Sequence, residues 1–335
     1  MGVGSPLPPN PRVAFLLRRR EPKYRDSLFQ RLSQIASIRT GYRNDRMPNL
    51  GLHSSRFHDM IQKDGSQTQR CVPLHPNLEG VLHMVVSRTP NMTDYEAERR
   101  SFHLEVPEYF NFATDVIGKW ASDPQKLAML WVGQNGERRQ LTFAHFAEQS
   151  SRAANAFAAL GIQKGDRVLV MLPRIPEWWE SVLGLMKIGA IPIPCTTLLT
   201  PKDIQFRAEA AEAAAFITDA EGSHKFDQVR GECPSIHFAI LVDERDADLS
   251  GRALWTNYHK VVEEASPVFT GPKTSSDDPC LVYFTSGTVG YPKMVLHTHA
   301  SYPIGHTITG KYWLDLHEDD LLWNLSKMGQ ANCQH

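Results

Sequence analysis

Short apolar runs alternate with segments of helical spacing through the middle of this chain. Runs of four to six residues, typical of buried strands, lie at 127–132, 168–172, 191–194, 215–218, 238–242 and 281–284. Apolar residues at helical spacing lie between several of these runs, in segments such as 143–158, 177–188 and 201–213. Successive strand–helix–strand units predict an α/β fold with a largely parallel sheet flanked by helices.

Residues that begin or end helices mark the boundaries of these segments. Gly161 and Gly189 follow two of the predicted helices, where glycine can take the left-handed conformation that ends a helix. Pro176 stands at a first helical position. Thr200, followed by proline and by Asp203 in the first turn, is a typical helix start.

One hairpin is predicted before the alternating units. The run 127–132 and the segment 138–142 are separated by an Asn135–Gly136 pair. Asparagine followed by glycine is the strongest short-range signal for a tight antiparallel turn. We therefore expect these two segments to pair as antiparallel strands.

Composition excludes several classes of protein. The chain has 335 residues with 41% hydrophobic residues and a formal net charge of −1, so overall charge gives no reason to expect nucleic-acid binding. No apolar run approaches the roughly 20 residues needed to span a bilayer. Five scattered cysteines argue against a disulfide scaffold or a structural zinc site and favour a reducing compartment.

Positive charge is concentrated at the N-terminus. Residues 1–46 carry ten basic and three acidic side chains, a net charge of +7. Such a leader is typical of a mitochondrial transit peptide, and equally of a disordered extension that does not fold. We expect residues 1–91 to form a disordered leader and linker before a domain at 92–335. The localisation is mitochondrial if this leader is real, and cytoplasmic otherwise.

The most distinctive segment directly follows the apolar run 281–284. It contains two glycines, several hydroxyl side chains and a terminal lysine, and it consists of Thr285, Ser286, Gly287, Thr288, Val289, Gly290, Tyr291, Pro292 and Lys293. Glycines let backbone N–H groups approach an anion, hydroxyls donate further hydrogen bonds and lysine adds a positive charge. The segment therefore favours phosphate binding over a plain glycine–serine hairpin with a solvated lysine.

Two other nucleotide-binding patterns fail on spacing. A Walker loop needs a glycine immediately followed by lysine and then serine or threonine, which this segment lacks. A dinucleotide fingerprint needs three closely spaced glycines and an acidic residue about 20 residues later, and no such string occurs.

The segment from Thr285 to Lys293 resembles the phosphate loop of adenylate-forming enzymes, which include acyl-CoA synthetases, luciferases and peptide-synthetase adenylation domains. Further strings resemble the medium-chain acyl-CoA synthetases and occur in the same order: Pro107-Glu108-Tyr109-Phe110-Asn111-Phe112-Ala113, Gly165-Asp166-Arg167-Val168, Leu172-Pro173-Arg174-Ile175-Pro176-Glu177-Trp178-Trp179 and Tyr312-Trp313-Leu314-Asp315-Leu316. The resemblance runs from Tyr95 to Gly329, about 70% of the chain.

This resemblance implies an acid–CoA ligase and the N-terminal portion of the large domain of that family. A carboxylic acid attacks the α-phosphate of ATP, which releases pyrophosphate, and the thiol of coenzyme A (CoA) then displaces AMP from the acyl-adenylate. Thr285 to Lys293 would hold the β- and γ-phosphates, with Mg²⁺ and lysines stabilising the charge. The implied small-molecule partners are the acid, ATP and CoA.

The chain also departs from the family. Val289 stands where a hydroxyl residue is usual, and Lys327-Met328 replaces the Asp-Thr that the subfamily carries before a glycine and a pocket tryptophan. The adenine-binding segment and the C-terminal lid domain with its catalytic lysine would lie beyond His335, so we name no catalytic residue and no metal ligand. The expectations are an incomplete domain and a chain that is inactive alone, with a non-catalytic nucleotide-binding or regulatory product as the alternative. An unrelated nucleotide-binding module is a third hypothesis.

Some residues near these motifs have structural interpretations. We interpret Arg174, Trp178 and Trp179 as packing residues, because indoles on a helix more often fill a core than contact a ligand. His297 and His299 follow the glycine-rich segment closely. Histidine in this stretch lies near the active site in the family, and an ordinary surface histidine is the competing interpretation.

Overall fold

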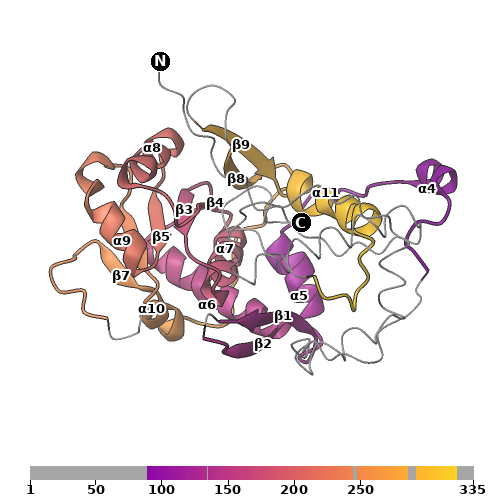
Figure 1. The fold of residues 1–335 in the computed structure, drawn as a ribbon, viewed down its shortest axis with the longest axis horizontal. Coiled ribbons are helices and arrows are strands. Elements are labelled where there is room, and N and C mark those ends of the chain that lie inside the picture. The colour runs from indigo at the N-terminus through magenta and orange to yellow at the C-terminus, as the bar shows by residue number, and fades with distance from the viewer. Residues whose placement is uncertain (1–88, 134, 244–246, 286–291, 323–335) are drawn as a thin grey trace, which may run out of the picture. The chain divides into compact units, whose positions relative to one another are not determined.

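The computed structural model describes residues 89–133, 135–243, 247–285 and 292–322 (Figure 1). Contacts within the chain divide it into two units, Met1–Thr93 and Asp94–His335. Residues 1–88 of the first unit, which make up nearly all of the expected leader and linker, lie outside the described residues. The fold below is that of the second unit.

A five-stranded parallel sheet forms the centre of this unit. Its strands are β3 (Arg167–Met171), β4 (Ile191–Pro194), β5 (Ala215–Thr218), β6 (Phe238–Leu241) and β7 (Trp255–Asn257), in the spatial order β4-β3-β5-β6-β7. Every neighbouring pair is parallel. This confirms the predicted parallel sheet, and the first four strands lie within one residue of the predicted runs.

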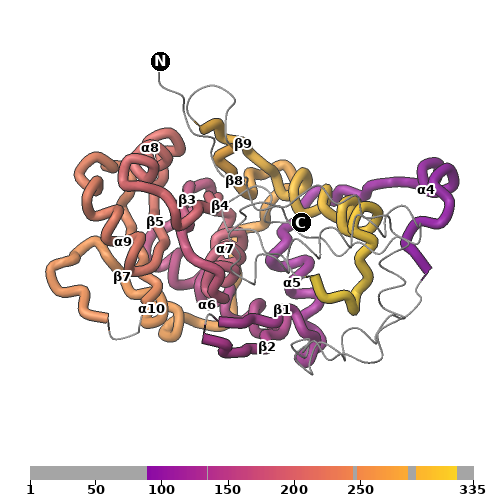
Figure 2. Tube along the Cα trace, in the orientation of Figure 1, coloured from indigo at the N-terminus to yellow at the C-terminus, as the bar shows by residue number. Residues whose placement is uncertain are grey.

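Helices cover both faces of the sheet (Figures 1 and 2). One layer consists of α6 (Phe143–Leu160), α7 (Pro176–Ile188) and α10 (Tyr258–Glu264), and the other of α8 (Pro201–Ala211) and α9 (Ala220–Asp227). Side chains of β3 alternate between the two cores: Val168 and Val170 belong to the first, and Leu169 and Met171 to the second. A strand buried on both faces explains why 168–172 reads as a continuous apolar run.

Most of the predicted helix boundaries are confirmed. Gly161 and Gly189 end α6 and α7 in the left-handed region, at φ values of +104° and +76°. Thr200 accepts a hydrogen bond from the Asp203 N–H while the Asp203 side chain bonds the Thr200 N–H, which completes a capping box before α8. The helix α8 ends at Ala211 rather than near 213, because Glu212 turns into the left-handed region at φ +45°.

The first predicted hairpin is also present. Strands β1 (Leu127–Val132) and β2 (Arg138–Thr142) pair antiparallel, with an irregularity between Leu127 and Met129. Gly136 in the connecting turn has φ +89°, a conformation that glycine adopts without strain. The prediction of an antiparallel pair around this turn is confirmed.

A second antiparallel hairpin lies at the glycine-rich segment, where the sequence left a hairpin as the alternative to phosphate binding. Strands β8 (Pro279–Thr285) and β9 (Lys293–Thr298) form their own two-stranded sheet, and β8 lies in contact with β4.

The remaining helical elements are short. They are α4 (Tyr95–Ser101), η1 (Phe112–Val116), α5 (Ile117–Trp120), η2 (Arg230–Glu232), η3 (Ala300–Ile304), α11 (Gly305–Ile308) and η4 (Thr309–Trp313).

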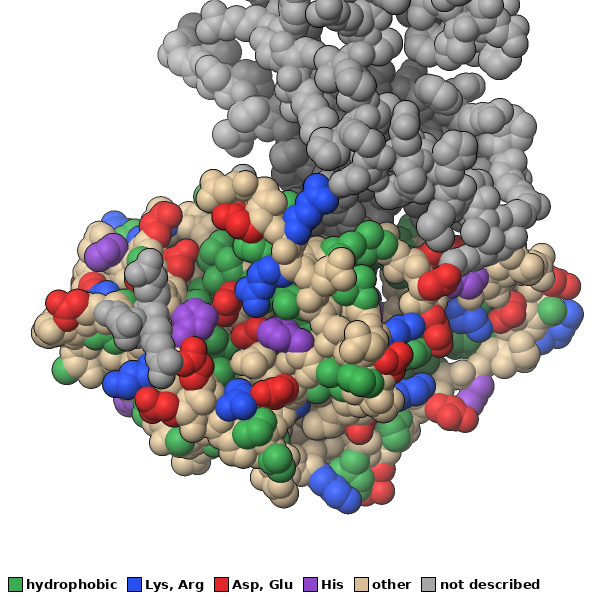
Figure 3. Space-filling model, turned by 90° about the horizontal axis from the view of Figure 1, so that it is seen from below, with side chains coloured by type: hydrophobic (Ala, Val, Ile, Leu, Met, Phe, Trp, Pro, Cys, Tyr) green, Lys and Arg blue, Asp and Glu red, His purple; other side chains and the backbone are tan. Residues whose placement is uncertain are grey.

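Two further observations concern membrane-spanning helices and the charge on one face of the molecule. In the described part of the chain, no helix is both long enough and apolar enough to cross a bilayer. On the face shown in Figure 3, basic and acidic side chains are interspersed rather than gathered by sign.

Candidate functional site

The glycine-rich segment lies at the turn of the second hairpin. Its first residue, Thr285, ends β8, and its last, Lys293, begins β9, and the two are paired directly across the hairpin. The Thr285 hydroxyl donates to the Lys293 carbonyl at 3.4 Å. The residues between them that the sequence predicted as phosphate ligands, Ser286, Gly287, Thr288, Val289, Gly290 and Tyr291, lie outside the described residues. Of the nine, Thr285, Pro292 and Lys293 are therefore placed.

The two strands hold the ends of the segment in different surroundings. Four successive residues of β8, Cys280 to Tyr283, are at most 5% exposed, whereas Lys293 to Leu296 of β9 are all exposed. Thr285 therefore ends a strand anchored in the core. Lys293 keeps its ammonium group at the surface, where it can meet a phosphate without the desolvation that a buried lysine would suffer.

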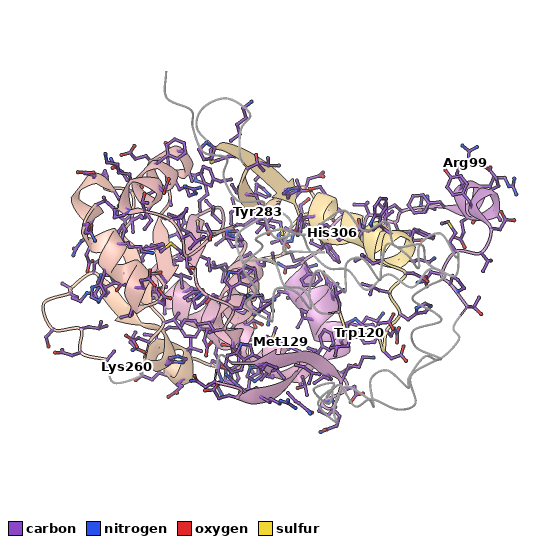
Figure 4. All side chains as sticks on the ribbon, viewed as in Figure 1. Arg99, Trp120, Met129, Lys260, Tyr283 and His306 are labelled. Atoms are coloured by element: carbon purple, nitrogen blue, oxygen red, sulfur yellow. The ribbon has the colours of Figure 1, made fainter. Side chains whose placement is uncertain are left out.

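An open hollow of about 420 Å³ lies beside Thr285. Most of its lining side chains are hydroxyl, imidazole or phenol groups of β8, β9 and the following helical turns. The lining residues are Tyr283, Thr285, Val295, His297, Ser301, Tyr302, Gly305, His306 and Thr309. Neighbouring rings meet edge to face, with centroids 4.3 Å apart for Tyr302 and His306 and 4.9 Å apart for His297 and Tyr302. Figure 4 labels Tyr283 and His306, which contribute from β8 and α11.

The two histidines after the segment are not ordinary surface residues. His297 is half-buried, and burial lowers the pKa of its imidazole. His299 has no exposed surface, and burial lowers its pKa to about 4, so the ring is neutral at physiological pH. Neither ring nitrogen of His299 has a hydrogen-bond partner among the described residues. For His299 the surface interpretation is wrong, because its backbone turns into the core directly after β9.

The cysteine in β8 is not placed to act as a nucleophile. Cys280 is fully buried, and burial raises the pKa of its thiol to about 12. A thiol in that state carries almost no reactive thiolate near neutral pH. Any thioester chemistry at this hairpin would therefore use a thiol brought by a substrate.

The interpretation of the tryptophans as packing residues is confirmed. Trp178 is 4% exposed and belongs to the core between α6, α7 and the sheet, and Trp179 packs against that core. Arg174 differs, because its side chain is exposed and its backbone carbonyl accepts a hydrogen bond from the Trp131 indole at 2.7 Å.

Sequence reasoning missed the contacts that hold the base of the hairpin. The string beginning at Pro107 was noted only for its resemblance, and in the structure it pairs with the segment before β8. The Phe110 N–H donates to the Thr274 carbonyl at 3.1 Å, and the Ser276 N–H donates to the Glu108 carbonyl at 3.0 Å. No periodicity signals such a pairing, because more than 160 residues separate the partners.

Comparison with known proteins identifies the family. Residues 118–332 match the family of AMP-binding enzymes. The chain belongs to this family. The matched residues include the whole glycine-rich segment and both strands of its hairpin.

Several curated proteins resemble this AMP-binding chain. The human mitochondrial acyl-coenzyme A synthetase ACSM3 is 37% identical over 248 residues, which is 72% of this chain and 42% of that protein. The human mitochondrial acyl-coenzyme A synthetase ACSM5 is 39% identical over 231 residues, covering 67% and 39%. The chain thus spans about two fifths of the length of the curated relatives it matches.

Solved structures of AMP-binding proteins share the fold. An acyl-CoA synthetase from Brucella canis superposes with a TM-score of 0.62 at 22% identity, covering 70% of this chain and 43% of that one. The anthranilate CoA ligase AuaEII, solved with anthranoyl-AMP, gives 0.54 at 23% identity, covering 61% and 38%. The α/β architecture expected from the sequence is therefore shared with acyl-CoA synthetases.

Proposed function

We propose that this chain carries the phosphate-binding part of an ATP-dependent acid–CoA ligase that activates a medium-chain fatty acid. The observation that carries the proposal is the pairing of Thr285 with Lys293 across the hairpin, which brings both ends of the glycine-rich segment together. A hydroxyl and an ammonium group then lie at the two sides of one turn, the arrangement suited to a chain of phosphates.

The proposed reaction has two steps. The carboxylate of the acid attacks the α-phosphate of ATP and expels pyrophosphate, which gives an acyl-adenylate. The CoA thiol then attacks the acyl carbon and expels AMP, so the thioester forms as the acyl–phosphate bond breaks. The loop from Thr285 to Lys293 would bind the β- and γ-phosphates and stabilise the negative charge on the departing pyrophosphate.

Magnesium fits this proposal as a companion of ATP. In the described part of the chain, no group of three or more His, Cys, Asp or Glu side chains is arranged to hold a metal ion. Mg²⁺ keeps several waters and is commonly bound through substrate phosphates with few protein ligands. We therefore propose that it enters the site as the ATP complex, where it neutralises phosphate charge.

Replacing Lys293 by alanine tests the proposed site. The variant Lys293→Ala is expected to weaken ATP binding about tenfold, since one charge-assisted contact to phosphate is lost. Affinity for ATP with Mg²⁺ is measured by calorimetry on the purified protein, with inorganic pyrophosphate as a competitor. The matched control is Lys260→Ala, an exposed lysine on α10 that is labelled in Figure 4 and should leave binding unchanged.

Two results would contradict the proposal. Equal ATP affinity in Lys293→Ala and in the unchanged protein would remove the loop from phosphate binding. A natural full-length gene product that binds ATP and yet releases no pyrophosphate with octanoate or other medium-chain acids would remove the ligase assignment and leave a nucleotide-binding protein.

We also propose a mitochondrial location. The relatives ACSM3 and ACSM5 are named as mitochondrial, and the net charge of +7 over residues 1–46 is of the kind that import receptors recognise. Residues 1–91 fused to a fluorescent protein are expected to direct it to mitochondria. Replacing Arg18, Arg19 and Arg20 by serine should weaken this import, and a diffuse cytoplasmic signal from the unchanged leader would refute the proposal.

A further inference from the structure

Asn111 joins three segments near the base of the phosphate hairpin. Its side chain is buried, with 6% of its surface exposed. The amide nitrogen donates to the Met186 carbonyl at 2.7 Å and to the Thr274 hydroxyl at 3.2 Å, and the amide oxygen accepts from the Ala113 N–H at 3.0 Å. One amide thus links the last turn of α7, the segment before β8 and the start of η1.

The segment that Asn111 holds is continuous with the hairpin. The Thr274 hydroxyl also donates to the Phe110 carbonyl at 2.9 Å. Two residues further, the Ser276 carbonyl accepts from the Ala300 N–H at 2.8 Å, just beyond the end of β9. The segment from Thr274 to Ser276 therefore touches the end of β9 and runs directly into β8.

A salt bridge also holds the start of the β8–β9 hairpin. The Asp278 carboxylate accepts from the Lys164 ammonium at 2.7 Å and from the Ser275 N–H at 2.8 Å, and these bonds lower its pKa. The Asp278 carbonyl accepts from the His299 N–H at 3.1 Å. Lys164 belongs to the turn that leads into β3, so the hairpin base is tied to the parallel sheet as well as to α7.

We infer that Asn111 is a positioning residue for the phosphate loop, acting through Thr274 and β8 on the placement of Thr285 and Lys293. This inference rests on the proposed function, because it needs the loop to bind phosphate. Asn111 itself touches no substrate. Strand β8 is seven residues long, so it separates the hydrogen bonds of Asn111 from the phosphate loop by about 20 Å.

The side-chain chemistry at position 111 is specific. The site needs two donors for Met186 and Thr274 and one acceptor for Ala113, which a single neutral amide supplies. Alanine leaves the buried Met186 carbonyl and Thr274 hydroxyl without this partner. Aspartate keeps the acceptor and places a negative charge against the Met186 carbonyl. Either change frees the segment before β8 to shift relative to α7.

The first test compares two asparagines that make similar contacts. Asn111→Ala is expected to weaken ATP affinity about tenfold, measured with Mg²⁺ by calorimetry on the folded protein. The control is Asn155→Ala on α6, whose amide also clamps a loop, with bonds to the carbonyls of Ser266 and Val268 at 2.7 and 2.9 Å. Both variants should lower the melting temperature, and the control should leave ATP affinity within about twofold.

A milder variant covers the case in which Asn111→Ala does not fold. Thr274→Val removes the hydroxyl that accepts from Asn111 and keeps a similar volume. We expect about a threefold loss of ATP affinity from this change alone. If both variants fold and bind ATP as tightly as the unchanged protein does, the inference is wrong, while the proposed function stands.

Combining the substitutions at Asn111 and Lys293 distinguishes an effect on the placement of the loop from a general loss of stability. If Asn111 acts by placing the loop, combining Asn111→Ala with Lys293→Ala should cost clearly less than the roughly 100-fold product of the two single losses. A fully multiplicative loss would show that Asn111 acts independently of the loop and would overturn the inference. An unchanged protein that binds no ATP would instead refute the proposed function.

Discussion

Replacing Gly184 by valine is expected to lower the free energy of unfolding by about 4 kcal/mol, near the upper end for a single substitution. Gly184 lies in α7 where that helix packs against α6. A Cβ atom at this position would stand 2.9 Å from the Ala153 Cβ, 3.1 Å from the Ala154 nitrogen and 3.2 Å from the Ser150 oxygen. Two of these atoms belong to the backbone of α6, so the clash cannot be relieved by turning a side chain.

The measurement is urea unfolding followed by circular dichroism. Gly118→Val is the matched control, because Gly118 also lies in a helix and no atom stands within 4 Å of an added Cβ. We expect this control to change the free energy of unfolding by less than about 0.5 kcal/mol. Similar losses for both variants would show that helix propensity, rather than the contact between α6 and α7, decides the cost.

The parallel sheet could be predicted because each of its main strands is buried on both faces. Such strands appear as short continuous apolar runs, and Gly161, Pro176 and Gly189 mark the helix ends through their own backbone preferences. The strand β9 escaped prediction because four of its residues, Lys293 to Leu296, are exposed and show no alternation of polar and apolar side chains. A strand in a small two-stranded sheet gives little periodic signal.

The sequence predicts phosphate chemistry at the glycine-rich segment, and this stays a prediction. The structure places the two ends of the segment, Thr285 and Lys293, opposite each other across the hairpin. The contacts that hold the start of the hairpin could not be predicted from the sequence, because Asn111 and Thr274 are separated by 163 residues. The burial of His299 was missed for the same reason, since it depends on how the segments from Asp278 and Ala300 meet.

A buried lysine in α7 makes stability depend on pH. Lys187 is 6% exposed, and its ammonium group donates to the Ala147 carbonyl at 2.9 Å and to the Ser151 hydroxyl at 2.8 Å. No acidic side chain in the described part of the chain forms an ion pair with it. Burial therefore lowers the pKa of Lys187 from 10.5 to about 8.

The sign of the effect follows from proton binding. Between pH 8 and 10.5 the unfolded chain holds a proton on Lys187 that the folded chain has released, so stability rises with pH through this window. Below pH 8 both states are protonated, and the charged group destabilises the fold by about 3 kcal/mol relative to high pH. Above pH 10.5 both states are neutral and this contribution is constant.

Replacing Lys187 by methionine should remove this dependence. Methionine fills a similar space without a charge, so the variant is expected to be about 2 kcal/mol more stable at pH 7, after allowing for two lost hydrogen bonds. The advantage should shrink toward zero by pH 10, because the neutral lysine no longer carries the cost of a buried charge. Urea unfolding at several pH values measures the difference, and Lys260→Met, an exposed lysine on α10, is the control. An advantage that stays constant from pH 7 to pH 10 would mean that packing volume, rather than the buried ammonium group, separates the two proteins.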